Sequence, residues 1–491
     1  MRPTGQPRRS PDDQHVTETS DIQAKTESVL LKHLPANPDS PPHLQKNAHL
    51  QYLVRNLVQG FPYSYISQDA SQPWLMYWTL QSFSLMGVAL DPDNKQKVIN
   101  TILAWQHPEG GFGGGPGQAP HLLPTYASVC ALAIVGRPGP GGGWDQIDKE
   151  NLYRFFMSLK QPDGSFLVSH DAEVDVRGTY CLLVVAYLLD LITPELLRGT
   201  PAFVASCQTY EGGFSSASQP YFIASSSHGT TKLLDTIRPP LGEAHGGYTF
   251  CALASWIMLQ PYFHSDHHSS ANSKPSVDYK RLMRWLVQMQ GSESELGGFR
   301  GRTNKLVDGC YSWWVGGCFA LLASQGIGGY RGPSQEDHER TNPAHDEASW
   351  HDVDESVWNQ QALQRYILCA AQHPSAGLRD KPPKSSDAYH TLYCLAGLSA
   401  AQHNVFPSPA RRAELSTAWQ ASVHPNGDEL RKAAFVEALS WTEEDGTSHV
   451  LGGQVNRVNA THPVFNLTMT HTEGVMSHFY KQTLPHKSAK H

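Results

Sequence analysis

An acid and a thiol stand two residues apart in the stretch NKLVDGCYSWW, residues 304–314. Asp308 and Cys310 offer an oxygen and a sulfur ligand, and a histidine from elsewhere would complete a three-ligand zinc site. His390, at the head of a later apolar segment, is the natural candidate. Three protein ligands leave the fourth tetrahedral position open, which is typical of catalytic zinc. The Asp-x-Cys pair alone is a weak signal, because Asp308 also suits the cap of a helix.

Basic side chains accompany this pair. The sequence RGRTNK places Arg302 and Lys305 just before it, and Arg177 and His245 stand at the start of other apolar segments. Cationic side chains at the N-terminal ends of helices are unfavourable without an anion, because the helix dipole is positive there. Several such side chains at one place suit a diphosphate. A solvated basic loop, or pairing of Arg177 with Asp175, explains the same residues without a ligand. We expect an anion pocket, with the solvated loop and the Arg177–Asp175 pair as the alternatives.

A local repeat predicts the scaffold that positions these residues. A glutamine, a glycine-rich turn with an aromatic residue and an apolar run recur as QHPEGGF, QPDGSF, QTYEGGF, SELGGF and, in degenerate form, QHPSAGL. The runs that follow, such as TYCLLVVAYLLDL, are apolar on all sides, whereas the segments between them, such as DYKRLMRWLVQMQ, are amphipathic. An inner ring of helices surrounded by an outer ring explains both. The predicted fold is all-α, an α/α barrel of about six helical hairpins.

A tyrosine near the start of each apolar run aligns the runs with one another. Three residues before these tyrosines lie Trp74, Leu123, Arg177, His245, Asp308 and Ser386. Residues three apart share a helix face, so we expect this set to surround one mouth of the barrel. The runs beneath are dense in aromatic residues and cysteine. They predict a funnel for an apolar tail below an anionic head.

Composition bounds the class of protein. The 491 residues carry a net charge of -7, which argues against nucleic-acid binding as the main function. No apolar run is long enough to span a membrane, and the N-terminus shows no secretory signal. Eight scattered cysteines without a CxxC pattern predict buried, reduced thiols and a cytoplasmic location. We expect a disordered arm over 1–46 and a barrel over 47–485, with loop insertions near 263–276 and 326–356.

Five longer blocks make the chain similar to a known family. DASQPWLMYW, EVDVRGTYC, EAHGGYTFC, GGFRGRTNKLVDGCYSWW and RDKPPKSSDAYHTLYCLAGLS follow one another from about residue 47 toward HPVFNL near the C-terminus. In this order they resemble the β subunits of protein farnesyltransferases. The resemblance implies a zinc-bound substrate thiolate that takes a farnesyl group from farnesyl diphosphate, on C-terminal CaaX proteins such as small GTPases. It also implies an obligate heterodimer with a farnesyltransferase α subunit.

The resemblance implies roles for individual residues as well. The zinc ligands fall on Asp308, Cys310 and His390. The diphosphate and isoprenoid site falls on His245, Gly246, Gly247, Tyr248, Arg302, Lys305, Tyr311, Trp314, Arg177 and Cys251. Asp380 assists magnesium (Mg²⁺) at the diphosphate, Trp74 with Tyr393 limits the length of the lipid, and Trp78 and Tyr389 line the peptide site.

Related activities remain as alternatives. A geranylgeranyltransferase type I β subunit is disfavoured because those enzymes resemble this chain but carry a smaller residue at Trp74 and a lysine at Asp380. Triterpene cyclases share a similar repeat, but their chemistry needs an acidic motif and the sequence contains no DxDD. A non-catalytic barrel used for protein binding would contain no zinc and would transfer no lipid to CaaX peptides. The chain departs from the resembled pattern at Ala388 and Trp313, neither of which is a proposed ligand.

Overall fold

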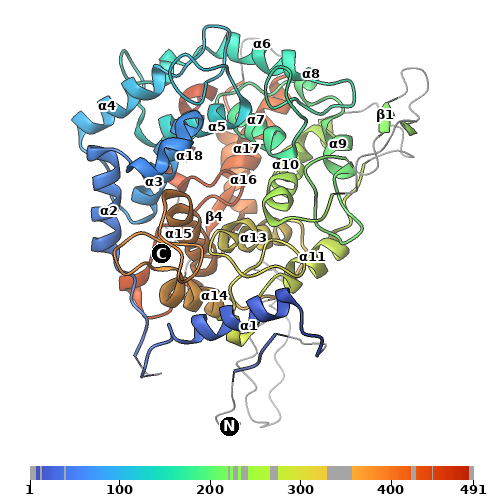
Figure 1. Ribbon diagram of the computed structural model, residues 1–491. Helices are drawn as coiled ribbons and strands as arrows, with labels where there is room; N and C mark the ends of the chain where they lie inside the picture. Colours follow the sequence, from blue (N-terminus) through green and yellow to red (C-terminus); the bar gives the residue numbers. More distant parts are fainter. Residues whose placement is uncertain are drawn as a thin grey trace, which may run out of the picture.

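Six apolar helices form a closed inner ring in the computed structural model of the chain (Figure 1). The structure describes residues 7–10, 14–37, 40–218, 242–265, 275–328, 357–421, 427–444 and 446–485, with the backbone of 222–224 and 231–233. The ring consists of α3 (Gln72–Leu85), α5 (Leu122–Val135), α7 (Val176–Leu188), α10 (Gly246–Ser265), α12 (Tyr311–Trp314) continued by α13 (Gly316–Ala323), and α15 (Ala388–Gln402). Each helix packs against the next, and α15 packs against α3 to close the ring. The predicted α/α barrel is confirmed.

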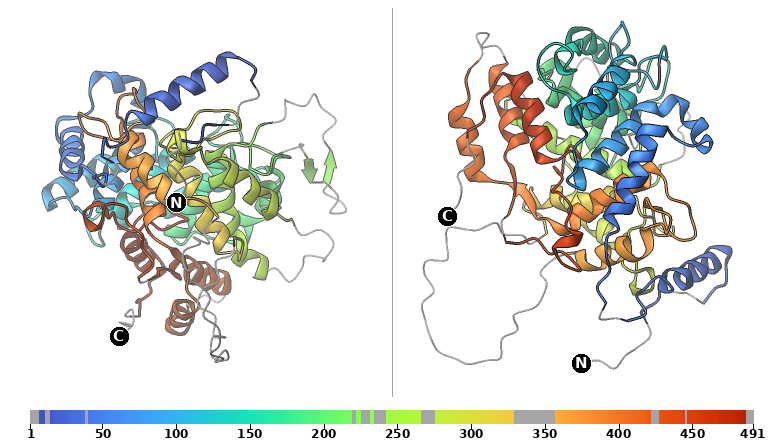
Figure 2. Two further views of the ribbon diagram at one scale, coloured as in Figure 1. Left: turned by 90° about the horizontal axis from the view of Figure 1, so that it is seen from below. Right: turned by 90° about the vertical axis from the view of Figure 1, so that its left-hand side faces the viewer.

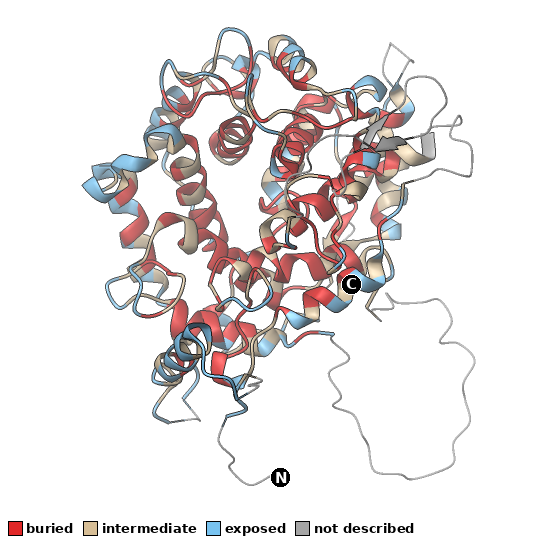
Figure 3. Cartoon of the chain, turned by 45° about the vertical axis from the view of Figure 1, so that its right-hand side comes forward, coloured by how far each residue is buried: buried red, intermediate tan, exposed pale blue. Residues whose placement is uncertain are grey.

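An outer helix precedes each inner one. The outer set is α2 (Lys46–Gln59), α4 (Pro92–Leu103), α6 (Lys149–Leu159), α8 (Pro194–Leu197) with α9 (Thr200–Ser206), α11 (Tyr279–Gln288), and α14 (Gln360–Tyr366) with the π-helical turn η4 (Ile367–Ala371). Four short 3-10 helices complete these segments: η1 (Tyr63–Ser71), η2 (Trp144–Gln146), η3 (Glu293–Glu295) and η5 (Gln454–Asn456). Figure 3 shows the inner helices buried on nearly every side, as their continuous apolar sequence predicts.

The glycine-rich turns join the two rings. Gln106 and Phe112 form an antiparallel bridge across the first turn, and the same bridge recurs at the four later turns. The Thr125 hydroxyl at the start of α5 accepts the Phe112 N–H at 2.9 Å and donates to the His121 carbonyl at 2.8 Å. Gly110, at φ +103, has no room for a side chain, because a Cβ there would overlap the backbone of α6. The turn therefore sets how closely an inner helix approaches the next outer helix.

The C-terminal segment is tied to the inside of the ring by three tyrosines. Tyr180, Tyr126 and Tyr77 stand on successive inner helices and donate to the carbonyls of residues 464, 465 and 466, at 2.9, 3.2 and 2.8 Å. Beyond this segment, α18 (Met469–Tyr480) packs against α5 and α7. The buried hydroxyl groups are satisfied by consecutive backbone carbonyls, so they fix where the segment crosses the barrel.

His462 anchors this segment and makes its stability depend on pH. Its buried imidazole donates to the Ala438 carbonyl at 2.8 Å and accepts the Val464 N–H at 3.2 Å, and burial lowers its pKa to about 4. As pH falls from about 6.5 toward 4, His462 becomes protonated in the unfolded chain but stays neutral in the folded chain. We expect the free energy of unfolding to fall over this range, and to fall less steeply in His462→Gln. Denaturant titrations at several pH values measure both slopes, and equal slopes would contradict this role.

The structure differs from the expected disordered arm at the N-terminus. Residues 18–31 form a helix, α1 (Glu18–Leu31), with a Thr17 capping box and with Glu27 and Leu30 buried. The helix packs against η3 on the outside of the ring, where Figure 2 shows it apart from the barrel helices. Docking explains the difference, because α1 buries Glu27 and Leu30 although the segment as a whole is not hydrophobic.

A helical pair between two short strands was also not anticipated. β3 (Val405–Pro407) pairs with β4 (Trp441–Glu443), and between them α16 (Pro409–Ala418) packs on α17 (Asp428–Leu439). A second antiparallel pair joins β1 (Phe222–Ala224) to β2 (Thr231–Leu233). The pair α16–α17 lies behind the ring in the view of Figure 1, on the side opposite to α1 (Figure 2).

The two predicted insertions fall mainly outside the described residues. Helix α10 continues through Ser265, so the first insertion begins later than expected, and residues 266–274 and 329–356 lie outside the description. The eight cysteines are all free thiols, as predicted. In the part of the chain that the structure describes, no helix is both long and apolar enough to cross a bilayer.

Candidate metal and anion site

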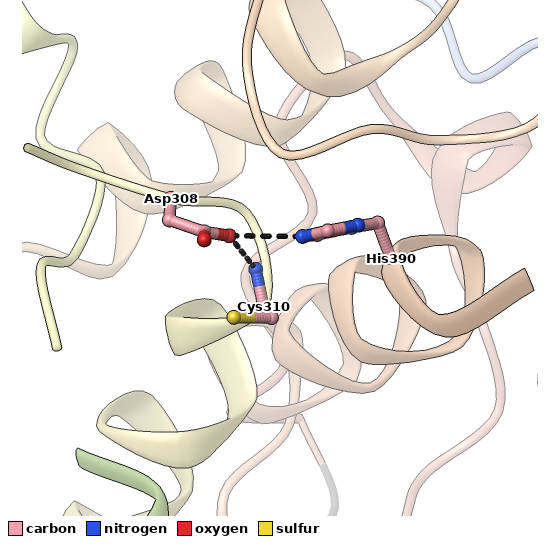
Figure 4. A group of neighbouring side chains, drawn as sticks. All are labelled: Asp308, Cys310 and His390. Carbon is pink, nitrogen blue, oxygen red and sulfur yellow. Dashed lines mark hydrogen bonds and ion pairs between the residues drawn. The ribbon is translucent and has the colours of Figure 1, made fainter. Parts of the chain in front are cut away.

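The three predicted metal ligands converge at one end of the barrel (Figure 4). Their ligand atoms all lie within 4.8 Å of one another, and His390 Nε2 is 3.2 Å from Asp308 Oδ1. Cys310 caps α12, and His390 lies in the first turn of α15, the next helix of the ring. Bonds of about 2.0–2.3 Å hold the ligands of tetrahedral zinc, so a small contraction of this group accommodates the ion.

Backbone contacts orient the two ligands of the loop before α12. Asp308 Oδ1 accepts the Cys310 N–H at 2.9 Å, so the carboxylate caps the helix as well as facing the site. The Gly309 N–H donates to the Asp380 carbonyl at 2.9 Å, and the same carbonyl accepts the Tyr366 hydroxyl at 2.8 Å. The simpler interpretation of Asp308 as a helix cap is thus correct, and it is compatible with metal binding.

His390 is held in the tautomer that a metal ligand needs. Asp387, the N-cap of α15, accepts the His390 N–H of the backbone at 2.7 Å and Nδ1 of the ring at 2.6 Å. A carboxylate on one ring nitrogen leaves the other nitrogen free to bind a metal. Nε2 is buried, and its 3.2 Å contact with the Asp308 carboxylate does not meet hydrogen-bonding geometry. A buried nitrogen that faces a carboxylate and a thiol in this way fits a bound cation.

The electrostatics of the site point the same way. Burial lowers the pKa of His390, but hydrogen bonds and charge from Asp308 and Asp387 outweigh it and raise the pKa to about 10. Burial, and then the charge of Asp308, raise the pKa of the Cys310 thiol well above its usual value. The site favours positive charge beside the carboxylates, and its thiol needs a cation nearby to ionise. The donor set and its charge fit zinc.

An imidazole–phenol pair stands beside this group. The Gly247 N–H donates to His245 Nδ1 at 3.0 Å, and His245 Nε2 lies 3.0 Å from the Tyr311 hydroxyl. Burial, Arg302 and Arg177 lower the pKa of His245 to about 4, so the ring is neutral and its hydrogen is on Nε2. The Tyr311 oxygen accepts that hydrogen, and its own proton can be donated to an anion. Burial raises the pKa of Tyr311, which keeps that proton in place.

The predicted cations are present but partly paired. Arg302 forms an ion pair with Glu243 at the surface, and Lys305 is exposed. Arg177 binds Asp175, with 2.6 Å between Nη2 and Oδ2, and its guanidinium lies 5.0 Å from the centre of the Tyr248 ring. The predicted alternative of an Arg177–Asp175 pair is therefore confirmed. Both arginines face solvent on one side, which leaves them able to contact a ligand.

Aromatic rings form a continuous wall next to these groups. The Trp314 indole donates to the Tyr389 hydroxyl at 2.9 Å, and its ring lies 4.4 Å from that of Tyr393. Tyr389 contacts Trp78 at 5.4 Å, and Trp78 stacks on Trp74 at 5.7 Å. Trp74 and Tyr393 are thus linked through the rings of Trp78 and Tyr389.

The remaining predicted residues occupy the same end of the barrel. Gly246 and Gly247 open α10, and Cys251 is buried one turn further along that helix. The Gly246 N–H donates to the Gly301 carbonyl at 2.8 Å, which joins α10 to the turn before Tyr311. The Asp380 side chain pairs with Lys381, and burial followed by the charge of Asp308 raises its pKa.

The structure corrects the alignment of the inner helices. Four of the helix-opening side chains accept the backbone N–H two residues later, and the fifth accepts the one three residues later. These residues are His121, Asp175, His245, Asp308 and Asp387. The interval from cap to tyrosine varies between repeats, so counting back three residues from the tyrosine matched only two of the five. The capping roles of Asp175, Asp387 and the half-buried His121 were missed, although an aspartate before an apolar run signals a cap.

Gly301 was also missed. A Cβ at this position would overlap the ring and the hydroxyl of Tyr311. Only glycine therefore allows the turn to lie against the phenol that faces His245. The sequence signal is the third glycine of GGFRG, which the turn itself does not need.

A large cavity lies elsewhere in the barrel. It has a volume of about 1630 Å³ and is lined by the C-terminal ends of α3, α5 and α13 together with α16 and the start of α18. The metal and anion groups lie at the N-terminal ends of the inner helices. The two features occupy opposite ends of the barrel.

Comparison with known proteins agrees with this geometry. The prenyltransferase α/α toroid domain matches residues 44–467. The farnesyltransferase β subunit of Pyricularia oryzae is 34% identical over 92% of this chain and 79% of its own length, and that of Schizosaccharomyces pombe is 36% identical over 78% and 85%. The chain belongs to the farnesyltransferase β-subunit family. The predicted resemblance and the predicted enzyme class are both confirmed by this membership.

A solved structure of another prenyltransferase shares the fold. Candida albicans protein geranylgeranyltransferase-I, complexed with GGPP, superposes with a TM-score of 0.58 over 89% of this chain and 98% of its own. At 18% identity this likeness supports the barrel alone. Membership in the farnesyltransferase β-subunit family rests on the sequence relatives.

Proposed function

We propose that the chain is the catalytic β subunit of a protein farnesyltransferase that acts on the cysteine of C-terminal CaaX proteins, including small GTPases. The observation that carries this proposal is the convergence of Asp308, Cys310 and His390 beside the Tyr311–His245 pair. A zinc ion held by these three ligands would lower the pKa of a substrate thiol and make it a nucleophile at neutral pH. Farnesyl diphosphate is the proposed donor.

The residues around the metal group account for binding and departure of the diphosphate. Arg302, Lys305 and Arg177 supply positive charge, and Tyr311 donates a hydrogen bond to an oxygen that gains charge as the carbon–oxygen bond breaks. The neutral His245 orients Tyr311 and does not itself need to transfer a proton. We also propose that Asp380 helps to hold Mg²⁺ at the diphosphate. Its carboxylate, which pairs with Lys381 in this structure, would then bind the ion instead.

The aromatic wall supplies the environment for the lipid and the peptide. Trp74, Trp78, Tyr389, Tyr393 and Trp314 bury apolar groups and exclude water from the reacting atoms. We propose that Tyr248 and Cys251 complete the isoprenoid surface on α10. A farnesyltransferase α subunit is the proposed partner, and the cytoplasm is the proposed location.

Two substitutions test the role of Tyr311. Tyr311→Phe removes the proposed donor, and Gly301→Ala adds a methyl group that displaces its ring. We expect each to lower kcat by about tenfold or more, because a positioned donor to a developing charge is lost. Zinc content should not change. Single-turnover assays measure the effect, with Gly474→Ala as control because its added methyl meets only an ordinary contact. Full activity in Gly301→Ala would contradict the assigned geometry.

Trp74 tests the choice between farnesyl and geranylgeranyl transfer. Its indole lies 5.7 Å from Trp78 and 5.5 Å from Tyr126, within the aromatic wall. Trp74→Ala removes bulk from the surface that faces an apolar tail, so we expect the relative use of geranylgeranyl diphosphate to rise by about tenfold. Competition between the two donors measures the ratio. An unchanged preference would show that another residue sets the lipid length.

A further inference from the structure

Residues 7–10 contact η3 and its flanking residue Ser292 through polar groups only. The Arg8 N–H donates to Glu293 Oε2 at 3.1 Å, and the Ser294 N–H donates to the Arg8 carbonyl at 3.2 Å. The Ser10 hydroxyl donates to Glu295 Oε2 at 2.9 Å and accepts Gln23 Nε2 at 3.2 Å. No apolar side chain of residues 7–10 is buried. This part of the contact opens at low cost in free energy, whereas α1 also buries Leu30.

Ser10 lies between two buried carboxylates. Glu27 on α1 is 5% exposed and accepts the Ser10 N–H at 3.4 Å, and Glu295 on η3 is 1% exposed. Burial raises the pKa of Glu27, but hydrogen bonds from Gln23, Ser10 and others outweigh it and lower the pKa. The hydroxyl is therefore one of the donors that allow two negative charges to face each other.

We propose that Ser10 is a phosphorylation site whose modification releases the arm and α1 from η3. The sequence Arg8-Arg9-Ser10-Pro11 presents the serine–proline pair that proline-directed kinases accept. With Mg·ATP as co-substrate, Ser10 Oγ attacks the γ-phosphorus and forms an O–P bond. The bond from that phosphorus to the β–γ bridging oxygen breaks, ADP leaves, and the hydroxyl proton passes to the catalytic carboxylate of the kinase.

The consequence follows from charge. A phosphoserine carries about -1.5 to -2 charge at neutral pH and donates no hydrogen bond from its ester oxygen. Glu295 then loses the Ser10 donor and faces the phosphate, as does Glu27. Arg300 already binds both oxygens of Glu295 at 2.9 and 2.7 Å, so pairing it with the phosphate would leave that buried carboxylate alone. Release of the arm separates the phosphate from Glu27 and Glu295, and it leaves Arg300 paired with Glu295.

Hydrogen–deuterium exchange of the full-length chain in its native assembly tests the proposal. The chain is treated with a proline-directed kinase and Mg·ATP, and mass spectrometry confirms one phosphate on Ser10. We expect amides of α1 to exchange about tenfold faster after modification. Ser10→Ala, which is neutral, and Ser28→Glu, which adds charge on the exposed face of α1, should both exchange close to the unmodified rate.

Three results would overturn the proposal. The first is failure of the kinase to modify Ser10. The second is unchanged or slower exchange in the phosphorylated chain, which would mean that the phosphate fits the docked arm. The third is an equally fast exchange in Ser10→Ala, which would assign the effect to the lost hydroxyl rather than to charge. None of these measurements depends on prenyl transfer, so they stand apart from the proposed function.

Discussion

Replacing Cys310 by alanine should remove bound zinc and lower farnesyl transfer on the order of a thousandfold. The thiol is one of three ligands within 4.8 Å of one another, and two ligands do not hold the ion at the affinity of three. Asp387→Asn keeps all three ligands but weakens the acceptor that orients His390 Nδ1 at 2.6 Å. We expect a smaller loss of about tenfold to a hundredfold in metal affinity or activity.

Metal analysis and transfer assays on the same preparations separate these effects. Cys207→Ala is the matched control, because its thiol is also buried but donates to the Phe203 carbonyl outside the site. The control should keep both zinc and activity. If Cys310→Ala retained stoichiometric zinc and full transfer, the assignment of the metal ligands would be wrong.

The second large effect concerns the attachment of α17. Arg431 Nε lies 2.8 Å from both oxygens of Asp190, and Nη2 donates to the Tyr480 carbonyl at 2.7 Å. The guanidinium also lies 5.2 Å from the Trp419 ring centre. Arg431→Met leaves the largely buried Asp190 without its partner, so we expect unfolding free energy to fall by about 3 kcal/mol. Chemical denaturation measures the change.

Arg412→Met provides the comparison for Arg431. Arg412 stands on the neighbouring helix α16 and binds Glu437 at 2.6 Å, but both side chains are about 40% exposed. Exposed pairs contribute little, so we expect a loss below about 1 kcal/mol. Equal losses in the two variants would contradict a specific anchoring role for Arg431.

The metal group was predictable because its residues carry their own signals. Asp308 and Cys310 are two residues apart, and His390 lies in the first turn of the following inner helix, so the repeat alone brings them to one end of the barrel. The ion pair of Arg177 with Asp175 could be predicted for a similar reason, since the two residues are only two positions apart in the sequence.

Other features depend on contacts between distant segments. Gly301 matters only because the Tyr311 ring folds back over it, and that approach is a property of the packed turn. Arg431 of α17 pairs with Asp190 just after α7, 241 residues earlier in the chain, and nothing in either local sequence indicates the partner. Nothing in the sequence around Glu27 of α1 distinguishes it from an exposed helical glutamate. It is buried only because α1 packs against η3. Local patterns could not predict these contacts.

The central claim is zinc-dependent farnesyl transfer. The most direct measurement gives the purified enzyme equal amounts of farnesyl and geranylgeranyl diphosphate with one CaaX peptide, before and after removal of zinc by a chelator. We predict that the farnesylated peptide dominates, that chelation abolishes transfer, and that added zinc restores it. A predominantly geranylgeranylated product, or transfer that persists at full rate without zinc, would contradict this account.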